Sequence, residues 1–493
     1  METEKLSVNP GAFQLIDKIR RLLAGEKSPS YLVGGFVRDL LVARDNADID
    51  IAVGEDAQKV AQKVAAALDG KYVPLDEENG VARVVIPGQD WHIDFSSYRD
   101  SIGDDLARRD FTFNAMALPL DEGFSSSVAI SRLIDPFGGL GDLRHRVLRI
   151  VNPGVFATDP VRLLRAIRIS AELGLMIERL TETRLRQCSR LISGVAGERV
   201  REELLRILAL PGAGNRIAFM DELGLLTAVI PELEHSRGVT QPVLHVWDVF
   251  THSVKMVSSV EFLLRQGAWE YAPPDALESV PWSEKLAAHF NEEIGYGSTR
   301  ASLLKLAALL HDIAKPEMKT TDETGRTRFL GHPEAGAATA AAIMSRLRFS
   351  NREVEYVELL VKEHMRPTQM SQDDTPTRRA VYRFFRDTGE SGVDLLFLSL
   401  ADHLAARGDT LDTTGWLEHA KMVADIIARR EEEDRAPKPL KLIDGNEIIS
   451  TFRLEPGPRI GEILETVREA QAAGEICDKE QAIKFIERWI GAH

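Results

Sequence analysis

Two glycines and two aspartates near the amino end have the residue types and the spacing for phosphate and metal chemistry. An apolar run breaks at Gly34 and Gly35 and continues into what the pattern predicts to be the start of a helix. Backbone N–H groups left free at a glycine-containing helix N-terminus favour an anion. Asp48 and Asp50 lie two residues apart in a second apolar run, and residues i and i+2 of a strand point to the same face. Their oxygens would converge on a hard divalent cation such as Mg²⁺.

A third carboxylate, Asp94, follows in an alternating segment. The segment Trp91-His-Ile-Asp-Phe95 predicts a strand in which Ile93 and Phe95 face one side and Asp94 faces the other. Three acidic groups from two strands would suit two metal ions, one activating an attacking hydroxyl group and one stabilising the leaving phosphate. Either half of this pattern alone is more often a turn glycine pair or a solvated acidic loop, because short motifs match by chance. Together they predict phosphoryl or nucleotidyl transfer.

The elements expected to position these groups are mixed at first and helical afterwards. Strand patterns occur at residues 31–33, 49–53, 83–86, 92–96 and 115–118. Residues 57–68 predict an amphipathic helix that ends at Gly70, a candidate C-cap. After Pro153 helical patterns continue to the end of the chain, beginning with residues 160–173, 178–191 and 198–210. The sequence therefore predicts an α+β fold, with an α/β head followed by helices.

Three later segments complete a family pattern. They are Arg108-Arg-Asp-Phe-Thr-Phe-Asn-Ala-Met-Ala117, Asp135-Pro-Phe-Gly-Gly-Leu-Gly-Asp142 and Thr158-Asp-Pro-Val-Arg-Leu-Leu-Arg-Ala-Ile-Arg168. With these motifs in this order, the chain resembles the class II tRNA nucleotidyltransferases and bacterial poly(A) polymerases of the polymerase-beta-like nucleotidyltransferase superfamily. The resemblance covers about residues 28–230. It implies a polymerase-beta-like head and template-independent transfer of nucleotides to an RNA 3′ end.

The resemblance assigns roles to the matching positions. Asp48 and Asp50 would hold the catalytic Mg²⁺ ions, with Asp94 as the third carboxylate. Asp159 and Arg162 would read the Watson–Crick edge of the incoming base, because a carboxylate only accepts and a guanidinium group only donates hydrogen bonds. The remaining nucleotide-binding positions are Gly34, Gly35, Arg38, Arg108, Arg109, Asp110, Asn114, Arg165 and Arg168.

Arginines recur along the last of these segments. Arg162, Arg165 and Arg168 follow at intervals of one turn and would form one basic stripe on a helix. An exposed charged helix face is the alternative explanation. Asp159 followed by Pro160 fits a capping aspartate with proline at the first helical position under either explanation.

Two features depart from the family pattern. Thr158 stands where the family usually has Glu, which bears on a supporting contact of the base-reading pair. The stretch between Asp94 and Arg108 is short, because only residues 96–107 fill it. Many members that add a full terminal triplet have a longer flexible loop there. The short stretch resembles enzymes that add two cytidines and leave the last adenosine to a partner.

A second group of ligand-type residues appears later in the chain. Its pattern of His, His-Asp and a distant Asp is similar to the HD superfamily of metal-dependent phosphohydrolases, and two further histidines match extra ligands of two-metal members. Mixed imidazole and carboxylate ligands suit Mn²⁺, Fe²⁺ or Ni²⁺. Lone histidines on apolar helices are usually satisfied core residues, and a degenerate site that only helps hold RNA is the competing interpretation. The residues are His252, His311, Asp312, His332, His364 and Asp402.

The composition is that of an ordinary globular protein, with 44% hydrophobic and 28% charged residues. No apolar run approaches the ~20 residues that span a bilayer, and the amino end lacks a signal-peptide pattern. Cys188 and Cys477 give neither a disulfide framework nor zinc-ligand spacing. These observations predict a cytoplasmic protein with no membrane partner.

The charge is unevenly distributed. The net charge of −15 argues against broad nonspecific affinity for nucleic acid. Residues 142–206, however, contain 13 Arg against eight Asp and Glu, a local balance of +5. Arginine binds phosphate and stacks on bases, so an RNA path along this region is favoured over a solvated scaffold.

At 493 residues the chain exceeds one core and should form several domains. We expect a nucleotidyltransferase head (1–150), a helical neck that reads the base and binds RNA (151–234), an HD domain (235–430), and a linker with a helical RNA-binding tail (431–493).

The expected function is addition of CMP, AMP or both to the tRNA 3′ end from CTP and ATP. Alternatives are a poly(A) polymerase on general RNA, an HD phosphohydrolase as the main activity, and a nonenzymatic RNA-binding protein. The sequence leaves the oligomeric state open.

Overall fold

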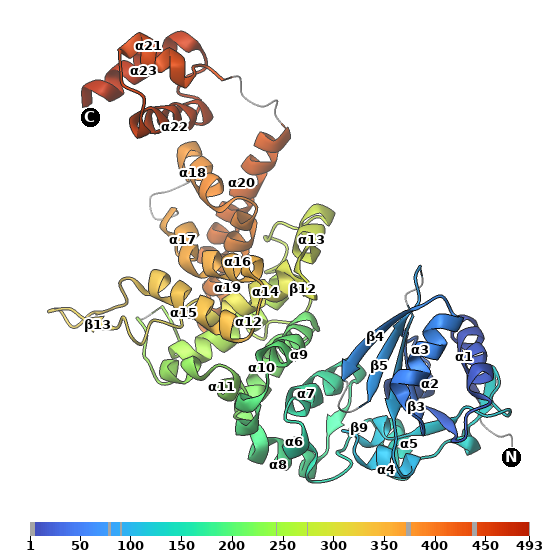
Figure 1. Cartoon of the computed structure of the whole chain (residues 1–493). Coiled ribbons are helices and arrows are strands. Elements are labelled where there is room, and N and C mark those ends of the chain that lie inside the picture. The colour runs from blue at the N-terminus through green and yellow to red at the C-terminus, as the bar shows by residue number, and fades with distance from the viewer. Residues whose placement is uncertain are drawn as a thin grey trace. The chain divides into compact units, whose positions relative to one another are not determined.

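The computed structural model describes residues 5–76, 80–88, 91–242, 244–273, 275–370, 376–435 and 441–492. The chain forms two compact units. The first is Met1–Val195 with Leu223–Leu225, and the second is Ala196–Glu222 with Leu226–His493. Figure 1 draws the first unit in blue to green and the second from green to red.

A six-stranded sheet forms the centre of the first unit. Its strands are β2 (Ser30–Val33), β3 (Asp48–Val53), β4 (Lys71–Asp76), β5 (Val81–Val85), β6 (His92–Ser97) and β7 (Ala117–Pro119). Their order in the sheet is β4-β5-β6-β3-β2-β7, and only β3 and β6 are parallel neighbours. Ile49 and Ile51 of β3 and Ile93 and Phe95 of β6 are fully buried. This alternation decides which face of the sheet carries the acidic residues.

The five predicted strands are confirmed, with ends that move by up to two residues. The strand β4 was not predicted, because Pro74 and polar residues interrupt any apolar alternation at this edge of the sheet. The last predicted strand starts late. A 3₁₀ turn, η1 (Thr112–Asn114), comes immediately before it, and Ala115 follows that turn.

Helices and short ladders surround the sheet. The described helices of the first unit are α1 (Pro10–Leu23), α2 (Gly34–Leu41), α3 (Ala57–Ala67), α4 (Ile102–Ala107), α5 (Gly139–Arg144), α6 (Val155–Thr158), α7 (Arg162–Leu173) and α8 (Arg179–Cys188), with the 3₁₀ turns η2 (Ile130–Arg132) and η3 (Ser189–Gly194). The ladders join β1 (Lys5–Ser7) to β8 (Ser127–Ala129) and β9 (Val147–Leu148) to β10 (Met176–Ile177). As predicted, α2 starts at the glycine pair and residues 57–67 form a helix. This helix, α3, packs against β5 and β6.

Two predicted helix ends need correction. The residue after α3 with a left-handed backbone is Asp69, with φ of 52°, and not Gly70. Gly70 instead donates its N–H to the carbonyl of Ala65 at 2.8 Å, and a Cβ atom on Gly70 would lie 2.9 Å from Val84 Cγ1. The helix predicted to start at Pro160 starts at Arg162, because α6 ends just before and the chain turns between the two helices.

The described part of the second unit is helical apart from two small hairpins. Its described helices are α9 (Gly197–Ala209), α10 (Ala213–Glu222), α11 (Leu226–Val229), α12 (Val249–Leu263), α13 (Glu284–Asn291), α14 (Arg300–Leu310), α15 (His332–Arg346), α16 (Asn351–Glu363), α17 (Arg366–Met370), α18 (Arg378–Thr388), α19 (Ser391–Arg407), α20 (Thr413–Arg435), α21 (Gly445–Phe452), α22 (Pro458–Ala472) and α23 (Lys479–Ala492), with the 3₁₀ turns η4 (Pro231–Ser236) and η5 (Gly408–Thr410). The hairpins pair β11 (Glu293–Gly295) with β12 (Ser298–Thr299) and β13 (Thr320–Thr321) with β14 (Thr327–Arg328). These hairpins, and the strand β10 of the first unit, interrupt the helical pattern predicted after Pro153.

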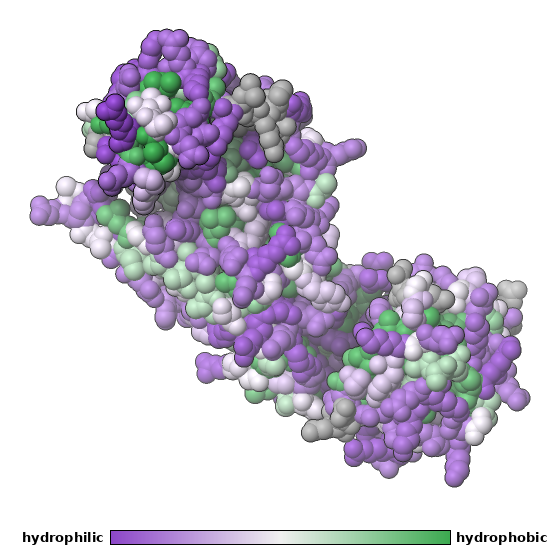
Figure 2. Space-filling model, turned by 45° about the horizontal axis from the view of Figure 1, so that its top comes forward, coloured by the Kyte–Doolittle hydropathy of each residue, from purple (hydrophilic) through white to green (hydrophobic). Residues whose placement is uncertain are grey.

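The centre of the second unit is a bundle around α14. Every residue of α14 is buried, and this helix packs against α12, α16 and α19. None of the described helices combines the length and the apolar character needed to cross a membrane. Hydrophilic residues cover most of the face that Figure 2 shows.

The last three helices have an apolar core of their own, which includes Ile448, Ile463 and Ile486. The linker predicted at residues 431–439 is partly helical, because α20 continues to Arg435. Residues 436–440 lie outside the described residues. Among the described residues, α22 packs against α18 of the rest of the unit.

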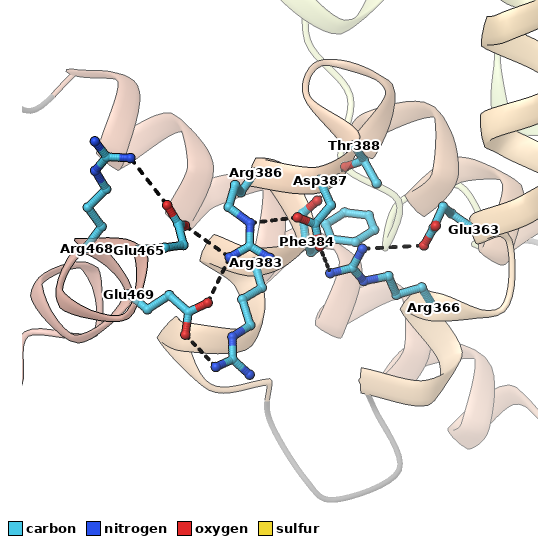
Figure 3. Close-up of polar contacts among 10 residues, drawn as sticks. All are labelled: Glu363, Arg366, Arg383, Phe384, Arg386, Asp387, Thr388, Glu465, Arg468 and Glu469. Atoms are coloured by element: carbon cyan, nitrogen blue, oxygen red, sulfur yellow. Dashed lines mark hydrogen bonds and ion pairs between the residues drawn. The ribbon is translucent and has the colours of Figure 1, made fainter. Parts of the chain in front are cut away.

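Ion pairs connect α22 to α18 (Figure 3). Glu469 of α22 is buried and pairs with Arg383 and with Arg386, whose Nη1 lies 2.8 Å from Glu469 Oε1. The same Arg386 nitrogen lies 3.0 Å from Glu465 Oε1. A buried carboxylate between two guanidinium groups is more stabilising than an isolated surface pair.

Glu469→Gln should weaken this attachment by about 1–2 kcal/mol, because two arginines lose their charged acceptor. Hydrogen–deuterium exchange of α18 and α22 would measure the change, and 1 M NaCl should reduce the difference between wild type and variant. Glu462→Gln, at an exposed position of the same helix, is the matched control. Equal exchange in all three proteins would show that the ion pairs do not hold α22.

Candidate functional site

The acidic residues of the first unit lie in line across neighbouring strands. In the parallel pairing of β3 with β6, Asp50 is opposite Asp94 and Asp48 is opposite His92. In the antiparallel pairing of β5 with β6, Arg83 is opposite Asp94. Because paired residues and alternate residues share a face, all five side chains lie on one face of the sheet. The structure thus brings the three predicted carboxylates together, and their metal-binding role stays a prediction.

Asp50 lies against the start of α2. The N–H of Gly35 donates to Asp50 Oδ2 at 3.1 Å. Gly34 has a φ of 65°, and a Cβ atom there would lie 2.8 Å from both Asp50 Oδ2 and Arg109 Nη1, so only glycine fits. Burial raises the pKa of Asp50 to about 6, against the opposing charges of Arg109 and Arg165. The carboxylate is thus held in a position that disfavours its charge.

Asp50→Asn should make the metal-free protein more stable at pH 7, by about 1–2 kcal/mol. The pKa of Asp50 is raised from 3.8 to about 6 in the folded state, so its ionised form costs stability above pH 6 and not below pH 4. The difference in free energy of unfolding between variant and wild type should therefore increase as pH rises from about 4 to about 6. Urea unfolding at pH 4 and pH 7 with a chelator present measures it. An equal difference in free energy of unfolding at both pH values would contradict the prediction.

Two residues that sequence patterns did not single out complete this face. Arg83 donates to both oxygens of Asp94, from Nε to Oδ1 at 2.7 Å and from Nη2 to Oδ2 at 2.8 Å. His92 Nδ1 lies 3.5 Å from Asp48 Oδ1. Asp94 is thus engaged by a bidentate ion pair, whereas the side chain of Asp48 is 61% exposed. His92 could have been found from the alternation around Asp94, but Arg83 depends on which strands pair.

A polar network continues from this face into the predicted nucleotide-binding residues. Arg38 Nη1 donates to Asn114 Oδ1 at 3.0 Å, and Asn114 Nδ2 donates to Asp110 Oδ1 at 2.9 Å. Arg165 Nε lies 2.9 Å from Asp110 Oδ2. Burial acts to raise the pKa of Asp110, but Arg165 and the hydrogen bond from Asn114 outweigh it and lower that pKa. The network fixes the orientation of Arg38 by connecting α2, η1 and α7.

The predicted base-reading residues lie where α6 ends and α7 begins. Asp159 has an extended backbone, and Arg162 Nε lies 3.8 Å from Asp159 Oδ2. Arg162 Nη2 also donates to the carbonyl of Arg108 at 3.1 Å. Arg168 differs, because its side chain is 9% exposed and pairs with Glu172 at 2.9 Å. The predicted continuous basic stripe is therefore wrong at Arg168, since position i+6 has rotated toward the core.

The two departures from the family pattern are visible in the structure. Thr158 is exposed at the end of α6, and its hydroxyl group donates to the carbonyl of Gly154 at 3.2 Å. The stretch between Asp94 and Arg108 is largely regular, because β6 continues to Ser97 and α4 begins at Ile102. Only residues 98–101 connect these two elements, so no long loop is present between Asp94 and Arg108.

The second unit brings together the six predicted ligand-type residues. Helix ends supply half of them: one histidine directly follows α14, one directly follows α16, and one begins α15. The others come from within α12 and α19 or directly follow the first of these histidines. In chain order they are His252 (α12), His311 and Asp312 (after α14), His332 (α15), His364 (after α16) and Asp402 (α19).

Asp312 lies at the centre of this cluster. Its Oδ2 atom is 3.1 Å from His311 Nε2 and 3.7 Å from His252 Nε2. Its Oδ1 atom is 3.4 Å from His332 Nε2 and 3.7 Å from His364 Nε2. Each oxygen therefore faces its own pair of imidazole groups, which divides the cluster into two positions that share one carboxylate.

Hydrogen bonds to the backbone orient three of the imidazole rings. The Nδ1 atoms of His311, His332 and His364 lie 2.7–2.8 Å from the carbonyl oxygens of the residues three positions earlier. This leaves each Nε2 atom facing the cluster, which is the arrangement that metal-bound histidines use. Both oxygens of Asp312 are buried and meet no hydrogen-bond donor in suitable geometry among the described residues. Buried carboxylate oxygens among imidazole nitrogens fit divalent metal ions.

The protonation states of Asp312 and His364 agree with metal binding, whereas burial acts to lower the pKa of His311 but the charge of Asp312 outweighs it and raises that pKa. Burial acts to raise the pKa of Asp312, but His311 and Lys315 outweigh it and hold that pKa well below its usual range. Lys315 Nζ lies 2.6 Å from Asp312 Oδ2. Burial and the neighbouring His311 lower the pKa of His364 to about 3. An ionised carboxylate and a neutral imidazole are the forms that bind metals.

Family comparisons match both units. The family described as "Poly A polymerase head domain" matches residues 30–101 and 92–149. The family described as "Probable RNA and SrmB- binding site of polymerase A" matches residues 174–236, and the HD domain family matches residues 283–407. His252 lies before that last range, although it joins the same cluster.

Curated relatives match nearly the whole chain. An A-adding tRNA nucleotidyltransferase of Deinococcus radiodurans is 37% identical over 93% of this chain and 95% of its own length. A CC-adding tRNA nucleotidyltransferase of Thermus thermophilus is 32% identical over 94% of both chains. The chain therefore belongs to the tRNA nucleotidyltransferase family. The family resemblance predicted from the sequence is confirmed.

Solved structures share the fold. The Thermotoga maritima CCA-adding enzyme complexed with tRNA has a TM-score of 0.65 and 23% identity, covering 98% of this chain and 96% of that one. A CCA-adding enzyme in complex with ATP has a TM-score of 0.66 and 22% identity over the same shares. The predicted α+β fold with a helical second part is confirmed.

Proposed function

We propose that this chain adds CMP, AMP or both to the 3′ end of tRNA and releases pyrophosphate. The observation that supports this most is the alignment of Asp48, Asp50 and Asp94 beside the glycine-containing start of α2. In the reaction, the 3′-hydroxyl oxygen of the RNA bonds to the α-phosphorus of CTP or ATP. The bond from that phosphorus to the bridging oxygen breaks, and pyrophosphate leaves. Bound Mg²⁺ would activate the hydroxyl group and neutralise charge on the leaving group.

The chain's own residues would act mainly by binding and orienting. The two aspartates of β3 would hold the cations. Arg38, whose direction the network with Asn114 determines, and Arg109 beside Asp50 would bind the triphosphate. Asp159 and Arg162 would accept and donate hydrogen bonds at the edge of the incoming base.

We further propose that the chain adds only part of the terminal triplet. The short connection at residues 98–101 resembles the short stretch of two-cytidine enzymes, and the relatives described above are an A-adding and a CC-adding enzyme. Partial addition would mean that a second enzyme completes the triplet. The cytoplasmic location predicted from the sequence remains a prediction.

One assay tests the reaction and its extent. The protein is incubated with tRNA transcripts that end before the triplet or after two cytidines, and with an unrelated RNA, each with CTP or ATP. We expect extension of one tRNA only: two cytidines on the first, or one adenosine on the second. Addition of the complete triplet would contradict partial addition. Long adenosine tails on every RNA would identify a poly(A) polymerase, and no incorporation would reject the proposal.

A second activity is proposed for the cluster around Asp312, which would be a two-metal phosphohydrolase centre. The observation that favours it is the division of six ligand-type side chains into two positions that share one carboxylate. Mn²⁺, Fe²⁺ or Ni²⁺ would supply a nucleophile by lowering the pKa of a bound water molecule. Hydrolysis of phosphomonoester and phosphodiester model substrates by the metal-loaded protein, and its loss on chelation, would test this activity.

A further inference from the structure

A loop beside the Asp312 cluster carries a histidine that no sequence pattern singled out. The loop, here called the strap, consists of residues 238–242 and 244–248, immediately before α12. Its two ends are joined, because Gly238 N–H donates to Asp248 Oδ2 at 2.5 Å and Val249 N–H donates to the carbonyl of Val239 at 3.0 Å. The strap is therefore a closed loop and not an extended linker.

The strap is attached to the helices that carry the cluster. The N–H of Val246 donates to the carbonyl of Ala406 at 2.9 Å, one turn after Asp402 in α19. Lys315, which pairs with Asp312, also donates to Gln241 Oε1 at 2.7 Å. These two contacts hold the strap over the side of the cluster where α12 and α19 meet.

The histidine of the strap, His245, faces two of the predicted ligands. Its ring centroid lies 5.3 Å from that of His252, with the rings at 75°. Donor atoms of His245, His252 and Asp402 all lie within 4.8 Å of one another. Its Nδ1 atom is buried and has no hydrogen-bond partner among the described residues. Buried ring nitrogens without a partner are rare unless an ion or water molecule satisfies them.

We propose that His245 is an additional metal ligand, supplied by the strap to the position formed by His252 and Asp402. This inference rests on the proposed metal centre of the second unit. Metal binding would then hold the strap against α12 and α19.

The two metal positions would consequently differ. The position beside the strap would have His245, His252, His311 and Asp402 in addition to the shared Asp312. The other position would have His332, His364 and Asp312. A position with more protein ligands is more closed, whereas one with fewer keeps sites open for water or substrate. The phosphate group of a substrate would therefore bind at the position of His332 and His364.

Metal binding itself provides the test. Wild type, His245→Ala and His245→Gln are freed of metal by chelation and titrated with Mn²⁺ by calorimetry, and bound metal is counted by elemental analysis. Ions held by Asp48 and Asp50 are subtracted by a parallel titration of an Asp48→Ala, Asp50→Ala double variant. We expect two bound equivalents in the second unit of wild type and a loss of about tenfold or more in affinity for one of them in both His245 variants. The exposed His235→Ala variant, in the same unit, should bind as wild type does. Thermal unfolding of the metal-free proteins checks that the variants fold.

Hydrogen–deuterium exchange gives a second measurement. Mn²⁺ should slow exchange in the strap of wild type and of His235→Ala, and have no such effect in the His245 variants. Unchanged affinity for both equivalents in His245→Ala and His245→Gln would overturn the inference, as would equal loss of both equivalents. If wild type bound no Mn²⁺, the metal centre of the second unit would itself be rejected, and that outcome is distinct from the other two.

Discussion

Asp48→Ala and Asp50→Ala should each lower the rate of nucleotide incorporation by about a thousandfold or more, equivalent to about 4 kcal/mol of transition-state stabilisation. Each change removes a carboxylate from the face of the sheet where the cations of the reaction are expected. Of the two aspartates, Asp50 has more contacts with its surroundings, because Gly34 and Gly35 both pack against its carboxylate. Single-turnover extension of a tRNA transcript with radiolabelled CTP or ATP measures the rate.

Asp45→Ala is the matched control for this experiment. Asp45 is exposed and lies three residues before Asp48, so its removal should leave incorporation unchanged. Asp94→Ala should have a smaller effect, about 10–100-fold, because Arg83 already engages both oxygens of Asp94. Incorporation by Asp48→Ala or Asp50→Ala at the wild-type rate would reject the assignment of this face as the active site.

Asp312→Asn should abolish tight metal binding at both positions of the second unit, with a loss of about a hundredfold or more at each. Each oxygen of the Asp312 carboxylate faces two histidines. The amide group of asparagine has one neutral oxygen in place of two charged ones. Equilibrium dialysis with Mn²⁺ measures the affinity, after subtraction of the ions that an Asp48→Ala, Asp50→Ala double variant no longer binds. Hydrolysis of phosphate esters should disappear with the metal, whereas nucleotide incorporation should remain.

The exposed Asp409→Asn variant is the control, since it removes the same charge from the same unit. Retention of one metal equivalent by Asp312→Asn would show that the carboxylate serves a single position. Simultaneous loss of nucleotide incorporation would show that the metal centre is required for the transfer reaction, against the assignment of that reaction to Asp48 and Asp50.

Local periodicity in the sequence determined much of the first site. The glycine pair at the start of α2 and the same-face arrangement of Asp48 and Asp50 depend only on neighbouring residues of one helix and one strand. The strands of the sheet followed from apolar alternation in the same way, except for the polar edge strand β4. The family motifs likewise lie within short segments, so they can be read without knowledge of tertiary contacts.

Tertiary structure decided which partner each charged group has. Arg83 meets Asp94 only because β5 pairs with β6 in one register, and a shift of one residue would turn the arginine to the other face. Arg168 has the same spacing as its neighbours Arg162 and Arg165 but is buried against Glu172. Burial of Arg168 therefore depends on how its helix packs against the core, and the helical period alone does not predict it.

The sequence by itself therefore determined the family, the α+β class and the residue types of the two candidate metal sites. Only tertiary structure decided that Asp312 divides its two oxygens between two pairs of histidines and that His245 reaches the cluster from a loop. The physical reason is distance along the chain. Periodicity relates residues within one element, whereas a carboxylate shared by four histidines from separate helices depends on how those helices pack.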